Sequence, residues 1–135
     1  MTRVPDSVRT IRVSAAVITD ADGRLLLVRK AGTTAFMQPG GKPEPGEDAA
    51  QTLIRELAEE IGVHVTERDL TALGEFTAPA ANEPGFSVVA DVLRVDIGEQ
   101  QPVADAEIEE LRWVDADAAS GLEVAPLAAA YFLPR

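Results

Sequence analysis

Three glutamates stand at a spacing that could do chemistry. Glu56, Glu59 and Glu60 lie at i, i+3 and i+4, which places them on one face if the segment is helical. Mg²⁺ prefers oxygen ligands, and proteins usually hold it with a few carboxylates plus substrate phosphates. Glu47, a little upstream, offers a further carboxylate. Two interpretations of this pattern are open: a site for a hard cation, or the solvated surface of an ordinary helix.

The loop that precedes these glutamates, residues 33–47, contains three prolines and three glycines. Neither a helix nor a central strand is expected at that density of Pro and Gly. Gly40 and Gly41 allow another group to approach the backbone closely, and their N–H groups could face an anion. An ordinary Pro/Gly turn would explain the same residues, so the loop alone leaves both interpretations open.

The glutamates fall within the strongest helix signal of the chain, Ala49–Ile61. Its apolar residues recur along one stripe at Ala50, Leu53, Ile54, Leu57 and Ile61. Asp48 precedes the helix at the end that favours negative charge, and Gly62 follows it as a stop signal. At about 100° per residue, the glutamate face points roughly 120° away from the apolar stripe. We therefore expect one face in the core and a second face crowded with carboxylates.

Shorter elements surround this helix and must position it. The other expected elements are strands at 10–18, 24–28, 70–78, 86–95 and 110–114 and a terminal helix at 125–132. The pair Asp22-Gly23 is a hairpin turn signal between the first two strands. Strands outnumber helices, and the two helices are far apart in the sequence. This pattern predicts the α+β class, with helices packed on a mixed sheet.

Composition limits the classes of function. A length of 135 residues predicts one domain over residues 1–135, and the absence of cysteine excludes a disulfide scaffold, a thiolate metal site and a cysteine nucleophile. The net charge of −11 argues against a nucleic-acid polymer or a membrane as partner. There is neither an apolar run of membrane-spanning length nor a secretory signal at the N-terminus. We expect a cytoplasmic domain, either a monomer or a homodimer.

Together, the loop and the helix resemble the signature of the Nudix hydrolase family, here over residues 41–63. That signature is Gly, five residues, Glu, seven residues, and then Arg-Glu-apolar-any-Glu-Glu-any-Gly-apolar. In this sequence it consists of Gly41, Glu47 and the run Arg55-Glu56-Leu57-Ala58-Glu59-Glu60-Ile61-Gly62-Val63. Every specified position matches, so the chain is identified as a candidate short, MutT-like member of the family.

The resemblance implies an α/β/α sandwich with a mixed β-sheet and a loop–helix–loop motif that binds metal. It also implies hydrolysis, dependent on Mg²⁺ or Mn²⁺, of a small-molecule nucleoside diphosphate linked to another group. A nucleoside triphosphate, an oxidised nucleotide or a sugar-nucleotide would meet that description, with water attacking one phosphorus. The alternative is a Nudix-fold module that binds such a nucleotide as a sensor without cleaving it.

By position in the signature, the resemblance assigns roles to individual residues. Glu56, Glu59 and Glu60 would be the metal ligands, and Glu59 and Glu60 therefore stand closest to the chemistry. Glu47 would support the site through the metal, through water or through the loop. Arg55 would orient a carboxylate rather than take part in a chemical step.

A general base is harder to assign from the sequence. Segment 104–110 supplies several acids ahead of Trp113. Glu107 is the first choice among them, because an acid at about this distance before the tryptophan recurs in the family. A solvated acidic loop is the alternative.

Substrate contacts are expected from the loop and the strand before it. Gly40 and Gly41 would approach the substrate, and basic residues often meet substrate phosphate in the family at the places of Arg29, Lys30 and Lys42. Phe36 is a candidate for holding a base. Gln38 stands where many relatives carry a large apolar residue, and this departure would alter the loop packing or the substrate pocket.

Overall fold

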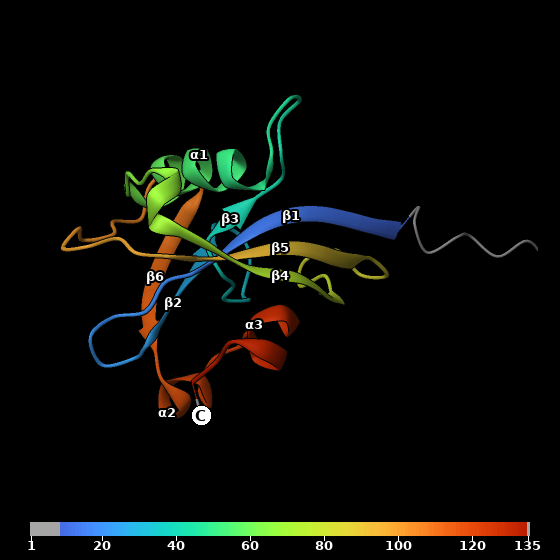
Figure 1. The fold of residues 1–135 in the computed structure, drawn as a ribbon. Coiled ribbons are helices and arrows are strands. Elements are labelled where there is room, and N and C mark those ends of the chain that lie inside the picture. Colours follow the sequence, from blue (N-terminus) through green and yellow to red (C-terminus); the bar gives the residue numbers. More distant parts are fainter. Residues whose placement is uncertain (1–8, 135) are drawn as a thin grey trace, which may run out of the picture.

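The computed structural model describes residues 9–134, which form sheets with helices on both sides (Figure 1). The elements are β1 Thr10–Val17, β2 Leu25–Lys30, β3 Gly40–Gly41, α1 Ala49–Ile61, the 3₁₀ helix η2 Glu67–Asp69, β4 Leu70–Pro79, β5 Ser87–Val95, β6 Ile108–Val114, α2 Ala116–Ala119 and α3 Pro126–Tyr131. Helix α1 covers one side of the strands, and α3 lies on the other. The α/β/α arrangement expected from the resemblance is confirmed.

The strands form two separate sheets. The larger sheet has the order β3-β1-β5-β4, in which β1 and β5 run parallel and the other neighbours run antiparallel. The smaller sheet pairs β2 with β6 antiparallel. The turn expected at Asp22-Gly23 closes a short hairpin, in which Asp20 N–H donates to the Arg24 carbonyl at 3.0 Å and Leu26 N–H donates to the Ile18 carbonyl at 2.9 Å. Beyond this hairpin β1 and β2 do not pair with each other, and β2 pairs with the distant β6.

Helix α1 has the bounds that the sequence predicts, because both of its ends are chemically marked. Asp48 accepts a hydrogen bond from the Gln51 backbone N–H at 2.8 Å, and the Gln51 side chain accepts one from the Asp48 N–H at 2.9 Å. This reciprocal capping box satisfies two N–H groups that the helix itself cannot. Gly62 ends the helix in the left-handed conformation at φ 64°, which favours glycine.

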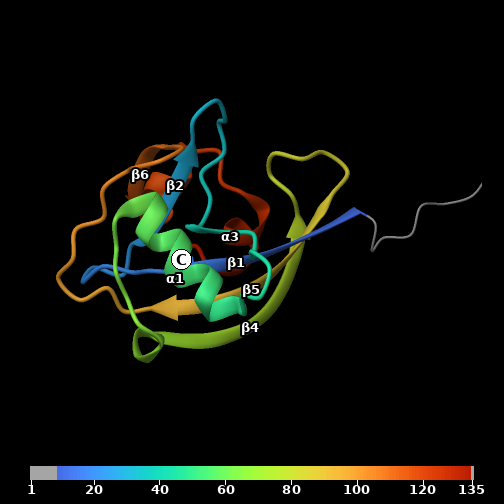
Figure 2. The same cartoon turned by 90° about the horizontal axis from the view of Figure 1, so that it is seen from above.

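Two apolar cores hold the layers together. The stripe of α1 buries Leu53, Leu57 and Ile61 against Ala16 and Ile18 of the strand layer. The opposite core lies toward α3 and includes Val17, Leu25, Leu27, Phe36, Val92 and Ala128. Figure 2, which looks down onto α1, shows the helix lying across the strands. Each fully buried Leu or Ile contributes about 1.5–3 kcal/mol, so the stripe fixes α1 firmly on the sheet.

The remaining differences from the expected elements are short. Loop 33–47 contains the two-residue strand β3, which lies at the edge of the larger sheet and not in its centre. The sequence pattern did not reveal η2 or α2, because three or four residues are too few to show a helical period. Within residues 9–134, no helix combines the length and apolarity needed to span a membrane.

Candidate active site

Strand β3 brings the glycine loop directly beneath α1. Gly41 pairs with Ser14 of β1, and Gly40 pairs with Ala15. A Cβ on Gly40 would overlap the Ser14 carbonyl oxygen, and the φ of Gly40 is 151°. A Cβ on Gly41 would lie 2.5 Å from Cδ of Glu56. Glycine is thus required at both positions, at one by the neighbouring backbone and at the other by a carboxylate of the motif helix.

Arg55 joins three glutamates of this region. Its Nε donates to Glu47 Oε2 at 2.7 Å, and its Nη2 donates to Glu47 Oε1 at 2.9 Å. Its Nη1 lies 2.8 Å from Glu56 Oε1 and 3.4 Å from Glu59 Oε2. A further bond from Nη2 reaches the Lys42 carbonyl at 3.0 Å, so Arg55 also fixes the loop. The hydrogen bonds that Arg55 donates to Glu47 are the main reason why the pKa of Arg55 is raised.

Glu47 is committed to this network. Besides the two bonds from Arg55, its Oε1 accepts the Glu44 backbone N–H at 2.7 Å. The hydrogen bonds from Arg55, assisted by that N–H, lower the pKa of Glu47 to about 2. The resemblance allows Glu47 to support the site through the metal, through water or through the loop. The contacts of Glu47 correspond to the last of these roles.

Glu60 is buried, with 3% of its surface exposed, and its Oε1 accepts a hydrogen bond from the Gly40 N–H at 3.0 Å. Burial raises the pKa of Glu60 to about 7, and the negative charges of Glu56 and Glu107 add to the rise, whereas the Gly40 N–H and the charge of Lys30 oppose it. The expectation of a carboxylate face separate from the core is therefore wrong at this residue. Glu60, at the end of the glutamate face, points toward β3, where its carboxylate meets the Gly40 N–H.

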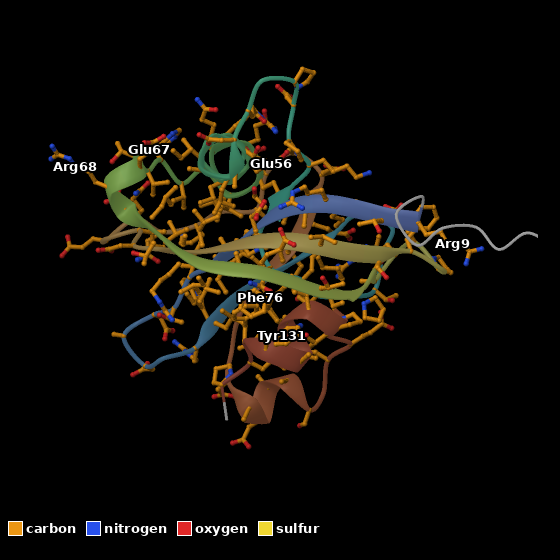
Figure 3. The ribbon with its side chains drawn as sticks, turned by 45° about the vertical axis from the view of Figure 1, so that its right-hand side comes forward. Arg9, Glu56, Glu67, Arg68, Phe76 and Tyr131 are labelled. Carbon is orange, nitrogen blue, oxygen red and sulfur yellow. The ribbon has the colours of Figure 1, made fainter. Side chains whose placement is uncertain are left out.

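A cavity of about 430 Å³ opens beside these groups. One part of its wall is polar and contains Ser14, Lys30, Gln38, Lys42, Glu44, Arg55, Glu56 and Glu107. Another part is aliphatic and contains Ile11, Val13, Val88 and Leu127, and the end of β4 with the loop after it, residues 79–83, also lines the cavity. Figure 3 shows Glu56 on the α1 side of the sheet, with Phe76 and Tyr131 on the opposite side.

The structure brings most of the predicted site residues together. Gly40, Gly41, Lys42, Arg55, Glu56 and Glu107 line the cavity, Glu60 bonds to Gly40, and Glu47 bonds to Arg55. Glu59 lies on the outer side, where its side chain is 55% exposed. Glu107 comes from the loop before β6, far from the motif in sequence, and its charge reaches Glu60.

Arg29 and Phe36 lie outside the cavity wall. Arg29 donates to the Thr33 carbonyl at 2.9 Å and pairs with Glu110 at 3.3 Å. Phe36 is buried, with the guanidinium carbons of Arg29 and Arg112 at 6.0 and 5.6 Å from its ring centre. Lys30, the next residue of β2, is the strand-end cation that lines the cavity. Substrate contact by Arg29 or Phe36 stays an untested prediction, and the present contacts of both residues are with the protein.

Reasoning from sequence alone missed the polar wall residues Ser14 and Gln38 as parts of this site. No motif marks Ser14, and its position follows only from the pairing of β1 with β3. Gln38 did leave a signal, because a polar residue stands there in place of a large apolar one.

The donor set of the site fits a hard divalent cation. Within residues 9–134, no three acidic or histidine side chains already converge as metal ligands do, and Arg55 is bonded to one oxygen each of Glu56 and Glu59. The candidate ligands nevertheless all carry carboxylate oxygens, and the buried Glu60 lies among like charges. A divalent ion would offset that repulsion, and Glu56 and Glu59 each have a second carboxylate oxygen besides the one bonded to Arg55.

The chain matches the model of one protein family, the NUDIX domain, over residues 8–135. Among curated proteins, it is 28% identical over 115 residues to the uncharacterized Nudix hydrolase YvcI of Bacillus subtilis, covering 85% of this chain and 72% of that protein. It is 38% identical over 87 residues to the CTP pyrophosphohydrolase of Escherichia coli, covering 60% of this chain and only 58% of that protein.

Among solved structures, the fold is similar to the solution structure of the E. coli ORF135 protein. The TM-score is 0.66 at 28% sequence identity, and the match covers 92% of this chain and 86% of the other. The similarity thus extends over most of both chains.

Proposed function

The chain belongs to the NUDIX domain family, and from this membership we propose that it is a metal-dependent pyrophosphohydrolase. Its substrate would be a nucleoside diphosphate linked to another group, such as a nucleoside triphosphate. The observation that carries the proposal is the cavity in which Glu56, Gly41, Glu107 and two lysines meet. The similarity to a CTP pyrophosphohydrolase supports the same class of reaction.

The proposed metal ligands are Glu56, Glu59 and Glu60, and Mg²⁺ is the ion that best suits such donors, with Mn²⁺ as a substitute. When bound, a divalent ion supplies charge neutralisation of phosphate and a lower pKa for water. Glu47 and Arg55 act as positioning residues, because their bonds hold the loop against α1 and orient the ligand carboxylates.

Three charged residues of the polar wall, Lys30, Lys42 and Glu107, would bind the substrate and move the proton. Lys30 and Lys42 line the cavity, and their ammonium groups would hold the phosphate oxygens. Glu107 would accept the proton of the water that attacks one phosphorus, while the bond to the leaving phosphate breaks. The products are two phosphorylated fragments, or a nucleoside monophosphate and pyrophosphate from a triphosphate. Orientation and electrostatics supply most of the catalysis in phosphoryl chemistry.

A panel assay tests this function. We expect nucleoside triphosphates, oxidised nucleotides, sugar-nucleotides and dinucleoside polyphosphates to include at least one substrate cleaved with Mg²⁺ and not with EDTA. The measurement is the separation of substrate from its phosphorylated products by anion-exchange chromatography, with Mn²⁺ added back to the EDTA sample. If the folded protein binds a nucleotide tightly but cleaves none of the panel with either ion, the sensor alternative is favoured over the hydrolase.

Gly41→Ala should damage catalysis more than it damages the fold. The new Cβ would lie 2.5 Å from the Glu56 carboxyl carbon, so the carboxylate must move, whereas the nearby backbone need not. We expect kcat/KM to fall by at least about tenfold, because displacements near 1 Å cost that much or more. Gly121→Ala is the matched control, since its Cβ would meet only a backbone oxygen at 3.9 Å. Equal activity of the two variants would contradict the assignment of Glu56.

A further inference from the structure

One polar group of the cavity wall has no role in the proposed reaction. Gln38 is 7% exposed, and its Oε1 is the one buried side-chain oxygen or nitrogen within residues 9–134 that lacks a hydrogen-bond partner. Gln38 lines the cavity just before β3. Buried polar atoms of native proteins are nearly always paired, so an acceptor without a partner beside a ligand cavity points to a donor on the ligand.

The other half of the same amide is already engaged. Nε2 of Gln38 donates to the Ala16 carbonyl at 3.1 Å. Turning the amide over would place Oε1 against that carbonyl oxygen, so the backbone fixes which atom is donor and which is acceptor. Nε2 keeps a second hydrogen, but Oε1 is the atom of this amide that has no partner at all, and a phosphate oxygen or a keto oxygen placed against Oε1 would be repelled.

The aliphatic part of the cavity limits how a base can be recognised. Ile11, Val13, Val88 and Leu127 offer apolar area, and none of the described residues that line the cavity is aromatic. A base placed there can bury its faces but cannot stack on a ring. Hydrogen bonds to the edge of the base must then set its orientation. In such pockets a small number of polar groups usually make these bonds.

We propose that Gln38 is a specificity-determining residue, whose Oε1 accepts a hydrogen bond from the exocyclic amino group of the nucleobase. The inference rests on the proposed function, which places a nucleotide in the cavity. An amino group projects beyond the ring and can reach a recessed acceptor, whereas a keto base would set oxygen against oxygen. The chain should therefore prefer cytosine to uracil, and adenine to hypoxanthine.

The test compares matched substrates in three proteins. The ratios of kcat/KM for CTP over UTP and for ATP over ITP are measured for the wild type, Gln38→Met and Ser14→Ala. Ser14 is the control because it is also buried, lines the same cavity and donates one bond to a backbone carbonyl, from Oγ to Ala49 at 3.0 Å. Both variants lose one buried bond to backbone, but only Gln38→Met loses the unpaired acceptor.

We expect the wild type to favour the amino-bearing member of each pair. The ratio should fall by about tenfold in Gln38→Met and stay within about twofold in Ser14→Ala, as the loss of one neutral hydrogen bond predicts. A wild-type preference for the keto members would overturn the proposal without any variant, so the test does not depend on the folding of Gln38→Met. An unchanged ratio in folded Gln38→Met would also overturn it.

Two further arms separate this proposal from related failures. In the first arm, CTP is compared with dCTP. If Gln38→Met loses a preference for CTP over dCTP but keeps its preference for CTP over UTP, the donor is a sugar hydroxyl and the base assignment is overturned. Dissociation constants for CTP and UTP are measured in EDTA, where no turnover is expected. If no nucleotide is cleaved by any protein but the binding ratio still depends on Gln38, the hydrolase proposal fails and the specificity proposal stands.

Discussion

Glu59→Gln should lower kcat/KM by about 1000-fold, as the removal of one strong charge from a phosphoryl-transfer site predicts. The fold and its stability should stay unchanged. The side chain of Glu59 is 55% exposed, and its one ion pair, to Arg55, is long at 3.4 Å. Exposed pairs of this kind contribute little to stability. A large loss of activity would therefore report a role in chemistry or metal binding, since the packing of the protein does not depend on this side chain.

The matched control for Glu59→Gln is Glu67→Gln, an exposed glutamate on η2 (Figure 3). Both changes remove one negative charge from the same face of the molecule. Initial rates at several Mg²⁺ concentrations separate weaker metal binding, which excess Mg²⁺ would partly restore, from a slower chemical step. If Glu59→Gln turns over substrate as fast as Glu67→Gln, Glu59 is not a metal ligand.

Glu60→Gln should stabilise the metal-free protein at pH 8 by about 3 kcal/mol. Burial raises the pKa of Glu60 from 4.5 to about 7. A group whose pKa is raised by folding makes its full contribution to stability only at pH values below its unfolded-state pKa. This stability is lost as the pH rises from about 4.5 through about 7, because ionisation then opposes folding. Glutamine cannot ionise and keeps an oxygen that can accept the Gly40 N–H.

Urea unfolding in EDTA at pH 5 and pH 8 measures this effect. The two proteins should have similar free energies of unfolding at pH 5 and should differ at pH 8, with the variant the more stable. Adding Mg²⁺ at pH 8 should stabilise the wild type more than the variant, because a ligand that binds only the folded state adds to stability. Equal stabilities at both pH values would show that Glu60 is not an ionised buried group in the metal-free protein.

The sequence predicts α1 and its chemistry well, because the information is local. Asp48 and Gly62 mark the two ends of the helix, and the signature fixes which glutamates share it. The approach of Gly41 to Glu56 also lies within this segment. Local spacing was therefore enough to predict the loop–helix part of the site.

The remaining features depend on tertiary pairing, which local patterns do not carry. Glu60 is buried because β3 passes beneath α1 and presents the Gly40 N–H, not because of its position on a helical wheel. Beyond the short turn that follows β1, strand β2 pairs with the distant β6. Phe36 lies near two arginines that are far apart in the sequence, so its aromatic character alone did not reveal its surroundings.

The bonds of Arg55 have a consequence for how the loop and helix assemble. The guanidinium is an internal counterion whose single positive charge offsets part of the repulsion among Glu47, Glu56 and Glu59. The same side chain bonds to the Lys42 carbonyl of the loop. The cation that holds the loop and helix together is thus part of the chain itself, so their arrangement does not depend on an ion from solution.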